Sequence, residues 1–85
     1  MRIKVKFFAS LREVLKTSEE HIDLPGHVVT VGQLRAYLGA RGEPWSEALA
    51  EGRAVRAAMN HDMVGLDMVL VDNAEVAFFP PVTGG

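Results

Sequence analysis

Charged and apolar residues alternate strictly at the start of this chain, and this pattern constrains the fold more than any other feature. Over residues 2–7 the even positions are basic and the odd positions are apolar. A period of two is typical of a β-strand with one buried face. We therefore expect a strand whose apolar side chains, Ile3, Val5 and Phe7, need a second layer to cover them.

A short helix and a second strand are expected to follow. Ser10 and Glu13 have the spacing of a capping box, and an apolar stripe behind them predicts a helix over residues 10–16. Residues 20–24 have the pattern of a weaker strand, which Pro25-Gly26 ends. The stripe of the helix consists of Leu11, Val14 and Leu15.

Two further helices are indicated before the chain returns to strands. Thr30 and Gln33 repeat the capping spacing, and apolar residues recur behind them at helical intervals as far as Gly39, where we expect the helix to end. Pro44 suits the first turn of a short helix because its missing N–H needs no partner there. The apolar side chains of the two helices are Val31, Leu34 and Leu38, then Trp45, Ala48 and Leu49.

The last third of the chain has the strand pattern again. Residues 55–59 alternate and are followed by a short return strand at Met63-Val64; a turn at residues 72–74 then leads to a last strand over residues 75–79. Asn73 tolerates the left-handed conformation that a tight turn needs. The order of elements is strand, short helix, strand, two helices and three strands. It predicts an α+β roll, a mixed sheet of about five strands with one main helix packed across it.

Composition excludes several classes of protein. Eighty-five residues fit one domain, and 48% apolar residues in so short a chain leave apolar surface for a partner. The absence of cysteine excludes disulfides, thiolate metal sites and cysteine nucleophiles. A net charge of −2 argues against nucleic-acid binding, and no apolar run is long enough to cross a membrane. The first residues lack the apolar block of a signal peptide, so we expect a soluble, cytoplasmic domain.

No catalytic or metal-binding constellation is recognisable in the sequence. The three histidines lack metal-ligand spacing, no serine stands in a nucleophile elbow, and there is no phosphate-binding loop. We expect no metal, no permanently bound cofactor and no active site of its own. Five basic residues against one acidic residue in the first sixteen positions form either a solvated face or a surface that steers an acidic partner. We interpret Met59, Met63 and Met68 as core residues.

The last eight residues form the most unusual segment. Two prolines favour an extended exit from the sheet, and two glycines have no side chain that would block a narrow channel in another protein. This pattern suits a carboxyl group delivered into a partner's active site, with Pro80–Thr83 as the arm, Gly84 as clearance and Gly85 as the reactive end. The alternative is a frayed terminus. Phe8 and Phe79 are candidate docking residues, for which core packing is the alternative.

These motifs resemble the family of small, sulfur-carrying subunits of molybdopterin synthase, and the resemblance covers essentially the whole chain. It is densest at residues 76–85, Val-Ala-Phe-Phe-Pro-Pro-Val-Thr-Gly-Gly, and recurs at residues 4–13 and 57–60. The chain departs from the family's pattern at Asn73 and Ala74, where Gly and Asp are usual. Because Asn is feasible in such a turn, the departure concerns local geometry and not function.

The resemblance implies a β-grasp, ubiquitin-like domain over residues 1–79 and an extended tail over residues 80–85. It implies that a separate adenylyltransferase, similar to ubiquitin-activating enzymes, uses ATP to adenylate Gly85, and that sulfur from a cysteine desulfurase system converts the carboxylate into a thiocarboxylate. The tail then enters the large subunit of molybdopterin synthase, and its sulfur attacks cyclic pyranopterin monophosphate. Two loaded carriers serve in turn within a heterotetramer. The inserted arm consists of Pro80, Pro81, Val82, Thr83 and Gly84.

Three other functions stay open at this point. A sulfur carrier for thiamine synthesis or tRNA thiolation has the same fold and Gly-Gly end, although the Phe-Phe-Pro-Pro-Val-Thr stretch favours molybdopterin synthesis. A protein modifier would be joined to lysines through Gly85. A non-covalent adaptor would use the surface of the fold and leave the tail inert.

Overall fold

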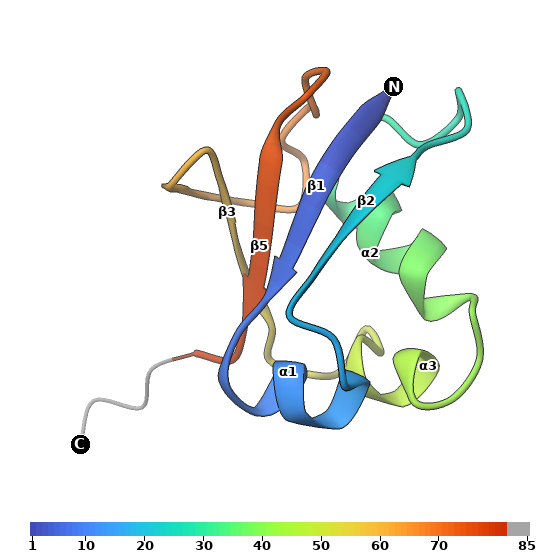
Figure 1. The fold of residues 1–85 in the computed structure, drawn as a ribbon, viewed down its shortest axis with the longest axis vertical. Helices are drawn as coiled ribbons and strands as arrows, with labels where there is room; N and C mark the ends of the chain where they lie inside the picture. Colours follow the sequence, from blue (N-terminus) through green and yellow to red (C-terminus); the bar gives the residue numbers. More distant parts are fainter. Residues whose placement is uncertain (82–85) are drawn as a thin grey trace.

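Five strands form a mixed sheet in the computed structural model, which describes residues 1–81 (Figure 1). The strands are β1 (Arg2–Phe7), β2 (Glu19–Asp23), β3 (Arg56–Met59), β4 (Asp62–Val64) and β5 (Glu75–Phe79). Their order across the sheet is β2-β1-β5-β3-β4. The two central strands, β1 and β5, run parallel, and the other neighbouring pairs are antiparallel.

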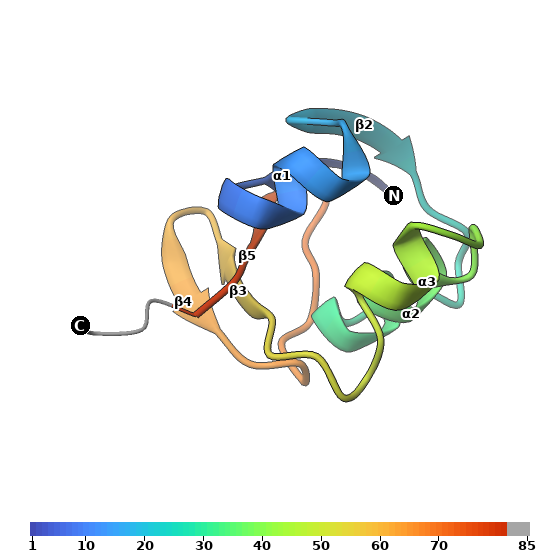
Figure 2. The same cartoon turned by 90° about the horizontal axis from the view of Figure 1, so that it is seen from below.

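Three helices lie against this sheet. They are α1 (Ala9–Leu15), α2 (Val31–Gly39) and α3 (Trp45–Ala48). Helix α2 crosses one face of the sheet, while α1 and α3 lie near the end at which β5 finishes (Figures 1 and 2). The eight elements follow one another in the predicted order, and the predicted α+β roll is confirmed. None of the helices in the described part of the chain is long and apolar enough to span a membrane.

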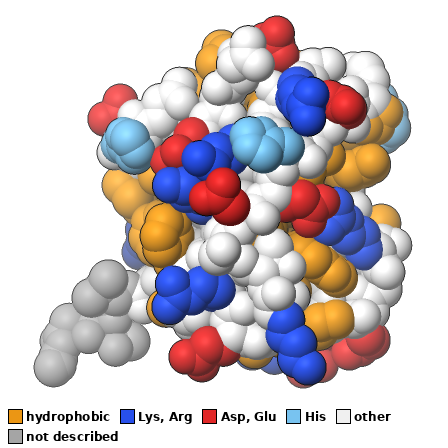
Figure 3. Space-filling view, in the orientation of Figure 1, with side chains coloured by type: hydrophobic (Ala, Val, Ile, Leu, Met, Phe, Trp, Pro, Cys, Tyr) orange, Lys and Arg blue, Asp and Glu red, His pale blue; other side chains and the backbone are white. Residues whose placement is uncertain are grey.

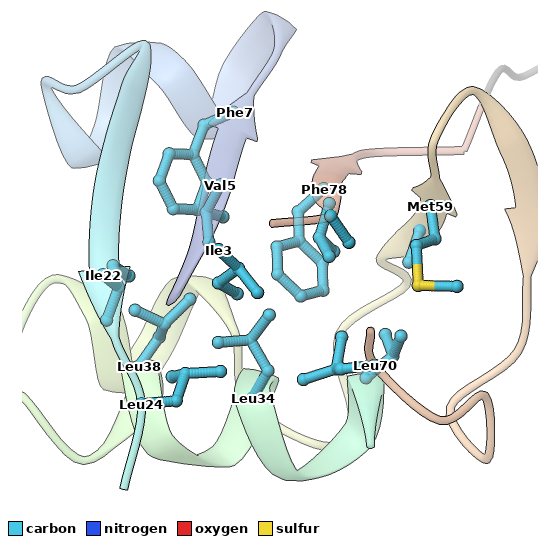
Figure 4. Packing of buried hydrophobic residues seen from close by; sticks show 14 of the residues in the cluster. Ile3, Val5, Phe7, Ile22, Leu24, Leu34, Leu38, Met59, Leu70 and Phe78 are labelled. Carbon is cyan, nitrogen blue, oxygen red and sulfur yellow. The ribbon is translucent and has the colours of Figure 1, made fainter. Parts of the chain in front are cut away.

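The core lies between the sheet and α2. Alternate residues of β1 and β5 face the helix, so Val5, Val76 and Phe78 have no exposed surface (Figure 4). Leu34 and Leu38 meet them from α2 and are equally buried. Burying a side chain of this size stabilises the fold by about 1.5–3 kcal/mol. Apolar residues therefore recur every second position in the strands and every 3.6 positions in the helix, where they face this core.

The start of α2 is held by the capping box that the sequence predicts. The backbone N–H of Gln33 donates to Oγ1 of Thr30 (3.1 Å), and the backbone N–H of Thr30 donates to Oε1 of Gln33 (3.1 Å). Two N–H groups that a helix start leaves without partners are satisfied in this way. The helix ends at Gly39, as expected.

The capping box predicted for α1 is wrong. The helix begins at Ala9, its cap is Phe8, and no side chain accepts a hydrogen bond at this end. The backbone N–H of Phe8 donates to the carbonyl of Phe78 (3.2 Å), so the end of β5 holds the residue before the helix. Ser10 therefore lies inside the first turn, where its hydroxyl cannot cap. Val14 of the predicted stripe is also exposed, because α1 packs against the domain only through Leu11 and Leu15.

The two departures from the family's pattern fit the turn before β5. Asn73 has a φ of 65°, the left-handed conformation that the sequence predicts. Its backbone N–H donates to the carbonyl of Arg2 (2.7 Å), which ties the turn to the start of β1. Ala74 is buried, with 1% of its surface exposed.

Two of the three methionines assigned to the core lie at the surface. Met59 is buried, but Met63 is 60% exposed and Met68 is 39% exposed. Strand β4, which carries Met63, is a short edge strand, and Met68 belongs to the loop between β4 and β5. The sequence showed their apolar character, but not that these segments run along the edge of the molecule.

Candidate functional site: the root of the carboxyl-terminal tail

The last strand carries the chain from the core to the start of the tail. Phe78 is fully buried, Phe79 is half-buried on the opposite face of β5, and Pro80 and Pro81 follow outside the strand. Because neither proline has a backbone N–H, the sheet ladder ends there. The other predicted tail residues, Val82, Thr83, Gly84 and Gly85, lie outside the described part of the chain.

The two candidate docking aromatics flank this exit. Phe8 is 43% exposed, and its backbone N–H is bonded to the carbonyl of Phe78, which holds it next to the end of β5. Phe79 lies opposite Arg56 of β3 in the sheet register. Phe8 is therefore not a core residue, whereas Phe79 is partly covered by its neighbours. Their role in docking stays a prediction.

A recess of about 450 Å³ opens beside Pro80. Leu11 and Val14 of α1 form one side of it, and Ala48 of α3 and Val55 form another. Helix α1, helix α3 and the segment before β3 thus line one recess at the base of the tail. An apolar recess in this place suits an apolar side chain of a protein that holds the tail.

The open face of the sheet carries neighbouring charges of opposite sign (Figure 3). Lys4 lies 3.6 Å from Glu19 on β2, and Lys6 lies 3.5 Å from Glu75 on β5. The basic residues of β1 thus face acidic side chains of the neighbouring strands. Of the two interpretations of the basic segment, this pairing favours the solvated face for β1, because carboxylates on the neighbouring strands oppose the charges of Lys4 and Lys6.

A network of side chains anchors the turn that connects α2 and α3. The guanidinium of Arg41 donates to both carboxylate oxygens of Glu20 (3.0 and 2.6 Å) and lies 4.6 Å from the centre of the Trp45 ring. Trp45 in turn meets Phe7 edge to face, with 5.4 Å between ring centres. The hydrogen bonds from Arg41 lower the pKa of Glu20 below its ordinary value, although partial burial opposes this shift.

The sequence reasoning missed Arg35, a buried charged residue. Arg35 is 8% exposed, and its guanidinium donates to the carbonyl oxygens of Leu49 (2.9 Å), Ala50 and Arg53 (2.8 Å). These bonds fix the segment between α3 and β3 against α2. The available signal was its place in α2, one residue after Leu34 and three before Leu38, on the apolar face of the helix. Among residues 1–81, no three His, Asp or Glu side chains gather to hold a metal ion.

Comparison with known proteins places the chain in a family. Residues 5–85 match the model of the ThiS family. The chain belongs to the ThiS family. It is 45% identical to the molybdopterin synthase sulfur carrier subunit of Escherichia coli, and the aligned region covers 98% of this chain and 99% of that protein. The predicted resemblance to this group of subunits is thereby confirmed.

Two solved structures share the whole architecture. The small archaeal modifier protein 1 of Haloferax volcanii is 30% identical, with a TM-score of 0.73, and the match covers 95% of this chain and 98% of that one. A chain in the complex of subunits 1 and 2 of the molybdopterin-converting factor from Helicobacter pylori is 27% identical. Its TM-score is 0.67, and the match covers 100% of both chains. The ThiS-family chain described here thus has the predicted ubiquitin-like β-grasp fold.

Proposed function

We propose that this chain is the sulfur carrier subunit of a molybdopterin synthase. The observation that carries the proposal is the 45% identity to the E. coli subunit over nearly the full length of both chains. In the proposed cycle Gly85 is first adenylated and then converted to a thiocarboxylate, which donates its sulfur to cyclic pyranopterin monophosphate. This transfer supplies the dithiolene of molybdopterin.

Elementary chemistry supports the separate steps. A carboxylate at neutral pH is a poor electrophile, so adenylation by ATP is needed before sulfur can replace an oxygen. The adenylyltransferase and the sulfur donor, a cysteine desulfurase system, are separate proteins in this proposal. Since the chain has no cysteine, the carboxyl group of Gly85 is the position that can carry transferable sulfur. A thiocarboxylate is ionised near neutral pH and acts as the nucleophile.

The proposed main partner is the large synthase subunit. The relative from H. pylori was solved as a complex of two subunits of a molybdopterin-converting factor, which supports a partner of this kind. Three features at the root of the tail support docking there: an exposed Phe8, a half-buried Phe79 and the recess beside Pro80. We propose that these residues dock on the large subunit while residues 80–85 enter its active site.

Intact mass tests the proposed carrier chemistry. The purified chain is weighed before and after incubation with ATP, the adenylyltransferase and a sulfur donor. We expect a gain equal to the exchange of one oxygen for one sulfur, and no gain for a variant that lacks Gly85. Loaded protein is then mixed with the large subunit and cyclic pyranopterin monophosphate, and we expect molybdopterin to form. A chain that gains no mass with active partner enzymes would contradict the proposal.

Extending the tail by one residue provides a second test. An additional alanine after Gly85 moves the terminal carboxylate away from the position that the partner's active site accepts. We expect molybdopterin synthesis to be abolished while the circular dichroism spectrum stays that of the native chain. Intact mass of the recovered protein shows whether the extension is still present. Normal synthesis by the extended chain would contradict the proposed role of Gly85.

A second candidate function is covalent modification of proteins. The similarity to the small archaeal modifier protein of H. volcanii favours it. In that case Gly85 would form an amide with a lysine of another protein. Denaturing gels of cells that express the chain would then show ladders that disappear when Gly85 is removed. Their absence, together with the mass gain described above, supports the carrier.

A further inference from the structure

A second recess lies along the flank of α2. It has a volume of about 600 Å³ and runs between α2 and the segment that follows α3. Five of the residues that line it are Gly, Ala or Ser, so a bound segment can approach closely there. We call it the α2 groove, and the residues that line it include Gly32, Ala36, Gly39, Ser46, Ala50 and Leu66.

Arg35 brings a positive charge to this groove. A guanidinium has five N–H donors, and three of those of Arg35 bind the carbonyl oxygens of Leu49, Ala50 and Arg53. The two donors on Nη1 have no acceptor among residues 1–81. Since every fully buried side-chain nitrogen and oxygen of these residues has a partner, solvent reaches Nη1, and Arg35 lines the α2 groove.

The charge of Arg35 persists despite its burial. Burial lowers the pKa of Arg35, and the neighbouring Glu51 opposes this effect. An arginine side chain nevertheless stays protonated in proteins. Arg35 therefore brings a positive charge with N–H donors that solvent can reach to the wall of the α2 groove, which suits one carboxylate. Glu51 also lines the groove, and its charge weakens the attraction for any anion, more for a highly charged one such as phosphate than for a single carboxylate.

We propose that the α2 groove binds the carboxyl-terminal Gly84-Gly85 end of a second copy of this chain. The two glycines fit between small residues, and the carboxylate of Gly85 accepts hydrogen bonds from Nη1 of Arg35. We assign the bound end to a second copy because β5 ends away from α2 in both views (Figures 1 and 2). The contact is head to tail, so it shelters the reactive end of one carrier at the back of another.

This inference rests on the proposed function only in taking Gly85 to have a free carboxylate. The association is weak because one small contact forms it, and it competes with the enzymes that take the tail. The association therefore becomes populated at high carrier concentration, where the Gly85 end of one unloaded chain occupies the α2 groove of another.

A peptide titration tests the α2 groove directly. The probe is the acetylated heptapeptide Phe-Pro-Pro-Val-Thr-Gly-Gly with a free carboxylate, and its carboxyl-terminal amide is the matched control. Each is added to the isotope-labelled full chain, and backbone amide signals are followed by NMR. We expect the acid to shift signals of residues 32–39 and 46–51, and the amide to bind about tenfold more weakly because it lacks the charge-assisted hydrogen bonds.

Two leucine variants locate the site without touching Arg35. Ala36 is exposed and lines the α2 groove, whereas Ala40 is exposed at the end of the same helix and does not line it. We expect Ala36→Leu to lose peptide binding at least tenfold by filling the groove, and Ala40→Leu to bind like the native chain. Equal binding of acid and amide, absence of binding by either at millimolar concentration, or native binding by Ala36→Leu would each overturn the inference.

The mass assay separates this inference from the proposed function. Ala36→Leu is expected to gain sulfur at Gly85 as the native chain does, because the α2 groove has no part in loading. Loss of peptide binding with normal loading therefore supports both proposals. If neither the native chain nor Ala36→Leu gains sulfur at Gly85, the proposed carrier function is wrong. The peptide titration then decides by itself whether the α2 groove binds the tail.

Discussion

Arg41 is the residue that most clearly joins distant parts of the fold. Its guanidinium binds Glu20 on the edge strand β2 and covers the face of Trp45 at the start of α3. The two side chains of the ion pair are each about one third exposed, so solvent screens their attraction. The geometry is nevertheless bidentate, the arrangement in which an arginine–carboxylate pair is strongest.

Glu20→Gln is expected to destabilise the fold by about 0.5–1 kcal/mol at neutral pH. The pKa of Glu20 is lowered in the folded state from its ordinary value of 4.5. The stabilising contribution is therefore complete above that ordinary value, and it is lost as the pH falls through the lowered pKa. Urea unfolding of the native chain and the variant measures the difference at each pH, and we expect it to shrink below pH 4.5.

Glu19→Gln is the matched control on the same strand. Its carboxylate lies 3.6 Å from Lys4 in a more exposed pair. We expect a change of less than about 0.5 kcal/mol in the free energy of unfolding. A pH-independent difference between the native chain and Glu20→Gln would contradict the assigned role of the Glu20 charge.

At the scale of elements, α2 depends on a close approach by the loop before β5. The backbone N–H of Gly32 donates to the carbonyl of Leu66 (2.8 Å), and that of Val31 donates to Met68 (2.9 Å). A Cβ atom on Gly32 would lie 3.0 Å from the oxygen of Leu66. Glycine at this position therefore lets the first turn of α2 accept a second chain segment beside it.

Gly32→Ala is expected to destabilise the fold by about 1–2 kcal/mol, because the added methyl group displaces the backbone of Leu66. Gly39→Ala is the control within the same helix, since a Cβ there would meet no atom within 4 Å. It is expected to stabilise the fold by up to about 1 kcal/mol through the higher helix propensity of alanine. Thermal unfolding of both variants measures the two changes in stability, which we expect to have opposite signs. If both substitutions stabilised the fold, the loop at Leu66 would move aside at no cost, which would contradict the prediction.

Arg35 fixes the segment between α3 and β3 from within α2. Arg35→Met keeps the apolar stem of the side chain but removes three hydrogen bonds to backbone carbonyls. Because the bond to Leu49 is buried, we expect a loss of about 2–4 kcal/mol in the free energy of unfolding. Arg12→Met, at an exposed position of α1, is expected to change it by less than about 0.5 kcal/mol. Similar values for the two variants would contradict the anchoring role.

Most of the elements were predictable from the sequence because their patterns are local. The capping pair Thr30 and Gln33 succeeded because both partners lie in one turn. The pair Ser10 and Glu13 failed because the backbone of β5, far away in the sequence, holds Phe8 and sets the start of α1. Burial of Arg35 was equally hidden, since its acceptors belong to a segment whose position depends on the whole fold.

The candidate site was predictable only in part for the same reason. The tail motif is contiguous, so its residues are visible in the sequence. The recess beside Pro80 is lined by α1, α3 and the residues before β3, and no local sequence pattern predicts that these segments come together. The position of Phe8 beside the end of β5 follows from the parallel pairing of β1 and β5, which is a property of the topology.

At the scale of the whole molecule, two consecutive residues of β5 face the core and the surface beside the tail. Phe78 points into the core and is stacked on Phe7, with 6.3 Å between ring centres, while Phe79 lies on the other face. Consecutive residues of a strand face opposite sides of its sheet. The same strand therefore holds the domain together and presents a side chain beside the tail.

Phe78→Ala and Phe79→Ala are expected to differ in what they weaken. Phe78→Ala removes a fully buried ring and should lower the free energy of unfolding by about 3–5 kcal/mol. Phe79→Ala should cost less than about 1.5 kcal/mol because its ring is half-buried, but it should weaken binding to the large synthase subunit by about tenfold. Urea unfolding and calorimetric titration measure the two quantities. Native affinity of Phe79→Ala would remove Phe79 from the docking surface.

The central position of β5 also determines how the domain resists a pull on its tail. A force on Pro80 runs along β5, which is paired over its length with β1 on one side and β3 on the other. Both rows of hydrogen bonds are then loaded in shear, so several must break together before the strand slides. We therefore expect the domain to stay folded under a pull on the tail until the tension breaks several hydrogen bonds together.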